Sequence, residues 1–237
     1  MSHKDIAIVA AMRLELSPLI GKLPSQQVSG VELFELPGAL VAMGGIGEKC
    51  ARRAAEVAIG HVQPKLLLSA GMVGAVSSRL KVGDVGRIRE VVDAATGARY
   101  AASGGGVWVL ATAQDVSDAK EKHELLTKFG VDVVDMEAAA VAQAAQEHGL
   151  EFAGLKAVCD DSAFTMPPLN RFITKHGRFS TRKFLMYMAL HPGWWGAVGK
   201  LRGNSNIAAA NLCRALQHLI ESGCQAPVAS YGSSPGK

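Results

Sequence analysis

The sequence has few charged residues and no long apolar run. Charged residues make up 19% of its 237 residues and hydrophobic residues 49%, which supplies a core and excludes general intrinsic disorder. The strongest apolar runs, 36–43 and 184–190, are far shorter than the roughly 20 residues of a membrane-spanning helix. The formal net charge is only +4, which does not by itself indicate nucleic-acid binding.

The cysteines show no spacing typical of a metal site or a disulfide framework. Cys50, Cys159, Cys213 and Cys224 stand far apart, without the closely spaced pairs that zinc sites use. Residues 1–5 do not have the pattern of a secretory signal. We therefore expect a reduced, cytoplasmic environment. No internal repeat is evident.

Short apolar runs alternate with alanine-rich segments along the chain. This alternation is typical of buried strands and covering helices in an α/β fold. Strands are predicted at 5–11, 31–35, 38–43, 65–70, 82–92, 107–112, 131–134 and 151–158, and helices at 48–61, 118–129, 136–148 and 204–221. We predict a single α/β domain over 1–222, with a central mixed β-sheet flanked by helices, and a frayed tail over 223–237.

Two segments rich in small residues follow predicted strands. Residues 44–47, Gly-Gly-Ile-Gly, lead into the helix at 48–61, and residues 71–75 are predicted to form a loop after the strand at 65–70. Ligand sites in α/β sheets favour the carboxyl ends of strands. These segments are therefore candidates for lining a site.

Three carboxylates stand at the ends of predicted elements: Glu15, Glu137 and Asp160. If the strands are parallel neighbours, all three reach one edge of the sheet. Cleavage of a glycosidic bond needs such groups, to protonate the leaving group, hold the sugar and assist a nucleophile. Each residue alone is more typical of a helix cap or dipole partner. The set of three favours glycosidic chemistry.

Five segments, in this order, resemble the purine nucleoside/uridine phosphorylase superfamily, which includes methylthioadenosine/S-adenosylhomocysteine nucleosidases. They are 6–15 (IAIVAAMRLE), 44–47 (GGIG), 69–74 (SAGMVG) with 80–84 (LKVGD), 135–139 (DMEAA) and 156–160 (KAVCD). One such motif is weak evidence, whereas five in order are strong. The resemblance implies an enzyme that acts on a small nucleoside as a homo-oligomer. It implies no metal or organic cofactor.

The resemblance also implies a role for individual residues. Asp160 matches the acid that protonates purine N7, which requires a protonated carboxyl group, a form that burial favours. Glu137 matches the carboxylate that binds the ribose 2′- and 3′-hydroxyls, and Met136 the residue packed against the sugar. Glu15 matches the glutamate that activates water in the nucleosidases.

The two small-residue segments match the loops that line the nucleophile pocket in this superfamily. The matching positions are Gly45 and Gly47 in the first segment, and Ser69, Gly71 and Met72 in and before the second. Backbone N–H groups in such loops can hold an anion. Phosphate is such an anion, and the subfamily resemblance described below implies it as the co-substrate.

Several positions depart from the superfamily pattern. Asp161 directly follows the expected acid and is an alternative to it. Val116 stands near the position of a base-stacking phenylalanine. Ser69 stands where hexameric phosphorylases carry a phosphate-binding arginine, and Arg13 is a candidate replacement. These residues leave hydrolysis and phosphorolysis open.

The charge of the chain is unevenly distributed. Residues 162–220 contain eight basic and no acidic residues, interleaved with seven aromatic ones, and the rest of the chain holds 17 basic and 21 acidic residues. Basic and aromatic residues together suit the surface of an anionic membrane. A core helix with a solvated basic face, or one at a dimer contact, is the simpler alternative. Nucleic-acid binding ranks low because no recognition module is present.

Residues 172–211 resemble the C-terminal region of hopanoid-associated phosphorylases, which are linked to release of adenine from adenosylhopane. This resemblance implies phosphorolysis of an adenine nucleoside with a hydrophobic 5′ substituent, giving adenine and a ribose 1-phosphate product. It also implies peripheral membrane contact through 171–202. Hydrolysis of methylthioadenosine-type nucleosides is the second hypothesis, and a non-catalytic nucleoside-binding or membrane-associated homologue is the third.

Overall fold

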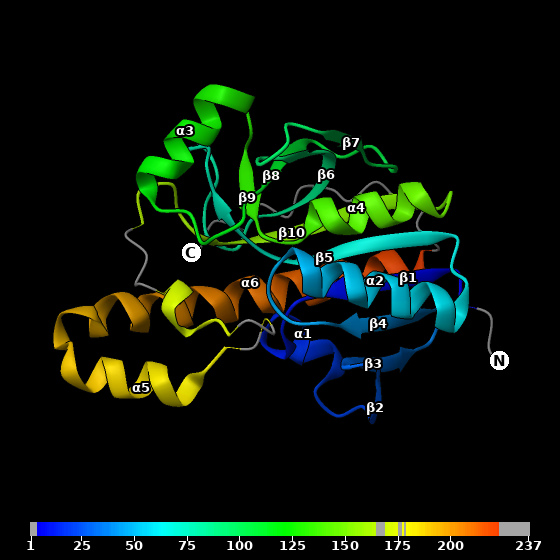
Figure 1. Ribbon diagram of the computed structural model, residues 1–237, viewed down its shortest axis with the longest axis horizontal. Coiled ribbons are helices and arrows are strands. Elements are labelled where there is room, and N and C mark those ends of the chain that lie inside the picture. The colour runs from blue at the N-terminus through cyan, green and yellow to red at the C-terminus, as the bar shows by residue number, and fades with distance from the viewer. Residues whose placement is uncertain (1–3, 165–168, 175–176, 178, 223–237) are drawn as a thin grey trace, which may run out of the picture.

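The computed structural model describes residues 4–164, 169–174, 177 and 179–222 (Figure 1). The predicted tail and the prolines at 167–168 lie outside these residues. The strands are β1 Ile6–Ala10, β2 Ser25–Val28, β3 Val31–Leu36, β4 Ala39–Met43, β5 Leu66–Ala75, β6 Val85–Asp93, β7 Arg99–Ala101, β8 Trp108–Thr112, β9 Val133–Asp135 and β10 Glu151–Asp160. The helices are α1 Arg13–Ile20, α2 Glu48–Val62, α3 Ala119–Phe129, α4 Ala138–Glu147, η1 Leu169–Phe172, α5 Thr181–Leu190, η2 Pro192–Trp194 and α6 Trp195–Glu221.

The strands of the described chain form one mixed sheet. β5 pairs with β10 and β9, β10 with β6, β6 with β8, and β8 with β9, so these five strands close into a ring. β1 and β4 extend the sheet beyond β5 by parallel pairing, and the β3–β2 hairpin completes this side. The single α/β domain with a central mixed sheet is confirmed.

Helices cover both faces of the sheet, as Figure 1 shows. Along β1, alternate side chains enter two different cores because successive residues of a strand point to opposite faces. Ala7 and Val9 pack in the core that includes α2 and α4, whereas Ile6 and Ile8 pack in the core that includes α1 and α6. This sandwich fixes the carboxyl end of β1, where Glu15 follows.

The predicted loop at 71–75 is wrong, because these residues continue β5. They pair with β10 on one side and, at Gly74 and Ala75, with β9 on the other. The small side chains that suggested a loop instead allow close approach within the closed ring. β10 is also longer than predicted, because Asp160 is the last residue of the strand rather than a residue that follows it.

The C-terminal helices differ from the prediction. α5 was not predicted, and α6 begins at Trp195 rather than at 204. The glycines at 196, 199 and 203 lower helix propensity at the start of α6, so the sequence pattern indicated a later start. Figure 1 shows α5 and the first half of α6 projecting from the domain. We call the described residues between 169 and 203 the arm.

The arm has an aromatic cluster of its own. The ring of Phe172 lies 5.3 Å from those of Phe184 and Tyr187 and 6.3 Å from that of Phe179, measured between centroids. Edge-to-face packing of this kind stabilises a small core. No described helix is long and apolar enough to cross a membrane.

Candidate active site

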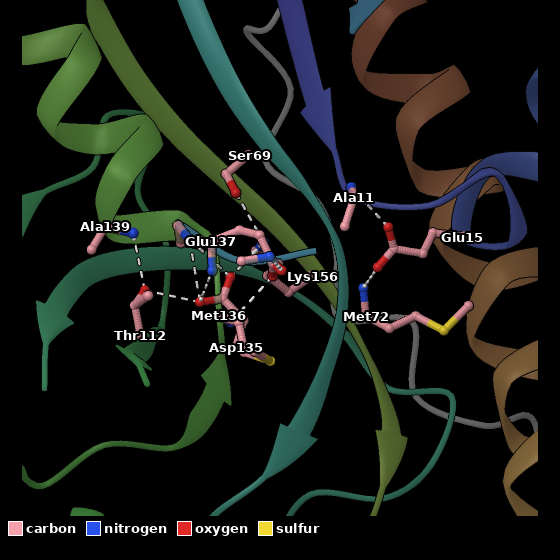
Figure 2. Close-up of polar contacts among 12 residues, drawn as sticks. Ala11, Glu15, Ser69, Met72, Thr112, Asp135, Met136, Glu137, Ala139 and Lys156 are labelled. Carbon is pink, nitrogen blue, oxygen red and sulfur yellow. Dashed lines mark hydrogen bonds and ion pairs between the residues drawn. The ribbon is translucent and has the colours of Figure 1, made fainter. Parts of the chain in front are cut away.

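Glu15 lies in the first turn of α1, directly beyond β1. Its Oε2 accepts hydrogen bonds from the backbone N–H groups of Ala11 and Met12 at 3.1 and 2.9 Å, and its Oε1 accepts one from Met72 at 3.0 Å (Figure 2). Only 5% of the residue is exposed. Burial raises the pKa of Glu15, while the three N–H donors and the charge of Lys156 oppose that rise.

Glu137 is the N-cap residue of α4. Its Oε1 accepts a hydrogen bond from the Gly47 N–H at 2.7 Å, and its Oε2 accepts one from the Met136 N–H at 3.2 Å. Burial, followed by repulsion from Asp135 and Glu15, raises the pKa of Glu137 to about 8. The first small-residue loop therefore holds the carboxylate predicted to bind ribose.

A buried lysine that was not among the predicted site residues completes this group. Lys156 Nζ donates to Ser69 Oγ at 2.9 Å and forms an ion pair with Asp135 Oδ2 at 2.8 Å. Oδ1 of Asp135 accepts a hydrogen bond from Thr112 Oγ1 at 2.8 Å. The sequence does contain a signal for this residue, since Lys156 lies within the apolar run 151–158. A lysine buried in such a strand needs a charged partner, and this need indicates a polar site.

These residues line one pocket beyond the carboxyl end of β1. Its lining is Val9, Ala10, Ala11, Glu15, Ser69, Ala70, Gly71, Met72, Glu137 and Lys156. The predicted residues Glu15, Glu137, Ser69, Gly71 and Met72 thus come together. The prediction assumed that the strands preceding the carboxylates are parallel neighbours, which does not hold for β9, because β9 runs antiparallel to β5. Glu137 reaches the pocket at the turn between β9 and α4.

Asp160 and Asp161 do not line this pocket. Asp160 is 2% exposed and forms a buried ion pair with Lys122 of α3. Asp161 Oδ1 accepts a hydrogen bond from the Ala163 N–H at 3.1 Å, and its Oδ2 lies 3.7 Å from Lys200 Nζ. Asp161 therefore belongs to the turn after β10, whereas the side chain of Asp160 is buried beside Lys122.

The remaining predicted residues lie around or outside the pocket. Gly45 lies close to the backbone of Gly177, at the edge of the arm. Val116 is half-buried in the connection between β8 and α3. Arg13 is exposed and pairs with Glu32 at 3.0 Å, so it supplies no phosphate contact in this structure.

A sequence profile described as the phosphorylase superfamily matches residues 5–108 and 107–182. The chain belongs to this superfamily. The match confirms the assignment made from the five ordered segments and, with it, the prediction of an enzyme.

Solved structures of other phosphorylase-superfamily proteins share the fold. A 5′-methylthioadenosine/S-adenosylhomocysteine nucleosidase from Neisseria meningitidis, in complex with methylthio-immucillin-A, matches with a TM-score of 0.69 and 20% identity, over 92% of this chain and 98% of that one. A nucleosidase of the same kind from Colwellia psychrerythraea, in complex with adenine, matches with a TM-score of 0.68 and 18% identity, over 93% and 96%. Futalosine hydrolase from Helicobacter pylori matches with a TM-score of 0.66 and 16% identity, over 91% and 98%.

The charges in the pocket of this superfamily member are predominantly acidic. Glu15 and Glu137 both line it, and Lys156, the one cation among the described lining residues, is already paired with Asp135. When these carboxyl groups are ionised, such a site stabilises positive charge that develops on a bound sugar ring and repels an anion that enters. Among the described residues, no group of three or more His, Cys, Asp or Glu side chains is placed to hold a metal ion.

Proposed function

We propose that this superfamily member cleaves the N-glycosidic bond of a purine nucleoside and that water is the nucleophile its pocket suits best. The observation that carries the proposal is the convergence of Glu15, Glu137 and Lys156 in one pocket. Two carboxylates beside a single paired lysine favour an oxocarbenium-like sugar and a neutral nucleophile. The solved relatives named as nucleosidases and futalosine hydrolase are consistent with this chemistry.

Each carboxylate has a distinct role in the proposed reaction. Glu137, held by Gly47, binds the ribose hydroxyls. Glu15 accepts a proton from water as the water oxygen bonds to the anomeric carbon. Asp160, matched to the leaving-group acid, lies outside the pocket lining in its ion pair with Lys122, so this role requires it to become accessible to the purine when substrate binds. It then donates a proton to purine N7 as the bond from N9 to the anomeric carbon breaks and its electron pair returns to the base. The products are the free purine and the free sugar.

Phosphate is the second candidate nucleophile. Ser69 Oγ and Lys156 Nζ lie together in the pocket, and the Met72 N–H faces it from β5. These groups can contact a phosphate oxygen. Phosphorolysis, the outcome predicted from the hopanoid-associated resemblance, requires them to outweigh repulsion from Glu15. Arg13 gives no help, because it is paired on the outside.

Adenine release separates these possibilities. The full-length protein is incubated with methylthioadenosine and with an adenosine that carries a long alkyl group at the 5′ position, with and without phosphate. Adenine and free sugar without phosphate support hydrolysis, whereas phosphate-dependent release of a ribose 1-phosphate supports phosphorolysis. Binding of the nucleosides without cleavage under either condition overturns the catalytic proposal and favours a binding protein.

For the substrate, we propose an adenine nucleoside with a hydrophobic 5′ substituent, such as an adenosylhopane-like compound. The arm contacts the loop at 44–47, which holds Glu137 through Gly47, since Ile46 donates its backbone N–H to the Gly177 carbonyl of the arm at 2.8 Å. The aromatic cluster lies in the same arm. If the preference is real, kcat/KM rises with the length of the 5′ alkyl chain; a constant or falling kcat/KM contradicts it.

The arm also suits a membrane surface, where such a substrate would reside. Met186, Leu190 and Trp195 are 64%, 78% and 60% exposed, and Lys183 and Lys200 are exposed beside them in sequence. Apolar side chains enter the interface while cations meet anionic headgroups. We expect the protein to bind anionic vesicles more weakly as salt rises.

Co-sedimentation with vesicles of anionic and neutral lipid tests the membrane contact. The double substitution W194A/W195A is expected to weaken binding to anionic vesicles, whereas V107A, at an exposed apolar residue just before β8, is not. Absence of binding at low salt, or an equal effect of V107A, contradicts the proposal.

A further inference from the structure

The ion pair between Lys122 and Asp160 is almost completely buried. The two side chains are 2% and 3% exposed. Lys122 Nζ also donates to the backbone carbonyl of Asp161 at 2.9 Å, and Cys159 Sγ donates to Asp160 Oδ1 at 3.3 Å. Each oxygen of the Asp160 carboxyl group therefore has a hydrogen-bond donor. The pair joins the start of α3 to the end of β10.

Lys122 occupies a position where an apolar side chain would be expected. It is the one buried residue of α3, a helix that begins with Asp118 as its N-cap in a capping box with Glu121. A buried ion pair generally adds little stability compared with a well-packed apolar pair. A role for Lys122 beyond stability is therefore worth testing, and Asp160, the residue matched to the leaving-group acid, is the group that it contacts.

The surrounding strands leave room for the pair. Asp160 pairs in register with Gly74 of β5 after an irregularity between Val158 and Asp160, which places Cys159 in a bulge. A Cβ atom at Gly74 would lie 3.1 Å from Asp160 Oδ2 and 3.1 Å from Lys122 Cε. Bulges commonly redirect side chains near active sites. Here the bulge and the glycine admit both charged groups.

We propose that Lys122 is a positioning residue for the leaving-group acid, orienting the Asp160 carboxyl group and supplying the proton that it passes on. The inference rests on the proposed function. Written as an ion pair, the two groups are an ammonium and a carboxylate. Transfer of one proton from Nζ to Oδ2 gives an amine and a carboxylic acid, a neutral pair that tolerates the dry surroundings.

The cycle closes without a further reactant. The Asp160 acid gives its proton to purine N7 as the glycosidic bond breaks and becomes a carboxylate again. Lys122 then takes a proton from water, so that the net transfer is one proton from solvent to the purine. The other ionisable groups at Asp160 are Cys159 on its own strand and Asp161 after it, and the latter faces Lys200 of α6.

The decisive variant is K122M, compared with K120M as a matched control. Lys120 lies on the same helix, but its side chain is 84% exposed and pairs with Glu124 at the surface. We expect K122M to lower kcat by about 100-fold or more, the usual size of a general-acid contribution, with little change in KM. K120M should retain the wild-type values.

The pH profile separates positioning from a merely structural role. Without the lysine charge, a buried Asp160 holds its proton to higher pH, so the alkaline limb of kcat/KM should move upward in K122M. K122R, which keeps the charge, should recover part of kcat. Assays from pH 5 to 9 guard against loss of folding in K122M, because burial raises the pKa of Asp160 and falling pH favours its uncharged form, which depends less on a charged partner.

Three results distinguish the possible failures. If wild-type protein cleaves no purine nucleoside, the proposed function fails. If the wild type is active and K122M keeps its kcat and its alkaline limb, the role of Lys122 is overturned. It is also overturned if K122M adds its full loss to that of D160N, since residues acting as one unit give less than additive effects.

Discussion

Gly47 donates its backbone N–H to Oε1 of Glu137 at 2.7 Å, and so joins the loop before α2 to the start of α4. The backbone of Gly47 has φ +93° and ψ 163°, a region that is essentially restricted to glycine. The orientation of the Glu137 carboxylate, which is proposed to bind ribose, therefore depends on a conformation that other residues adopt only with strain.

Substitution of Gly47 by alanine is expected to weaken substrate binding. A Cβ atom at this position meets nothing within 4 Å, so the cost comes from the backbone and amounts to about 1–3 kcal/mol. Relief of that strain would move the N–H away from Glu137 and raise KM. Steady-state kinetics and urea unfolding measure the two effects.

Gly30 provides a control for Gly47. It has φ +78°, a Cβ atom added to it would meet nothing within 4 Å, and it lies in the turn between β2 and β3. G30A should lower stability but leave KM unchanged. An equal rise of KM in both variants would show that strain alone, and not the contact with Glu137, affects binding.

The raised pKa of Glu137 predicts a pH dependence of stability. Its folded value of about 8 exceeds the ordinary value of 4.5, so the folded state binds more protons between these pH values. The free energy of unfolding should therefore fall as pH rises through this window, by at most about 1.4 kcal/mol per pH unit for one group. E137Q should reduce the slope measured by urea unfolding from pH 5 to 8.

Glu147 is the matched control for this measurement. Its carboxylate is exposed and paired with Arg52, which lowers its pKa. Its contribution is therefore lost only as pH falls below the window. E147Q should leave the slope between pH 5 and 8 unchanged, and a slope that also persists in E137Q would assign it to other buried acids such as Glu15.

Much of the fold could be predicted from local sequence patterns. β1, α2 and α3 follow apolar runs, alanine-rich composition and the Asp118 cap, all of which act over a few residues. The continuation of β5 through Gly71 to Ala75 could not be predicted in this way. It depends on pairing with β10 and β9, and such long-range pairing overrides the local preference of small residues for loops.

The site was predictable where a residue's role resides in a motif. Glu15 and Glu137 meet in the pocket as expected, whereas Lys156 and Lys122 were not predicted although both are buried opposite aspartates. Ion pairs between distant elements leave no regular spacing in a sequence. Arg13 shows the converse, since its place beside a motif did not reveal that Glu32 would bind it on the surface.

Loss of the Lys156 charge is expected to impair both stability and catalysis. K156M leaves Asp135 without its ammonium partner, and removal of one member of a buried pair costs about 3–5 kcal/mol. S69A removes only one hydrogen bond to Nζ, which is worth about 1 kcal/mol. We therefore expect thermal stability and kcat to fall more in K156M than in S69A.

K156R tests which property of Lys156 matters. An arginine keeps the charge but brings a larger, planar group into a position where only 2% of the lysine side chain is exposed. Recovery of stability with continued loss of kcat would indicate that the position of Nζ in the pocket matters. Full recovery of both stability and kcat would show that the positive charge is the only property of Lys156 that matters.

Glu15 offers the sharpest prediction about the nucleophile. E15Q removes the carboxylate that would accept a proton from water, so hydrolysis should fall by about 100-fold or more. The glutamine amide N–H₂ group would also face at least one of the backbone N–H groups that now donate to the Glu15 carboxylate. Two donors facing each other should cost about 1–3 kcal/mol of stability. If phosphate is the nucleophile instead, E15Q should lower the KM for phosphate, because the substitution removes a negative charge from the pocket.

E32Q is the control for E15Q, since Glu32 binds Arg13 outside the pocket. It should change neither hydrolysis nor phosphorolysis. Hydrolysis by E15Q at the wild-type rate would remove Glu15 from the proposed mechanism.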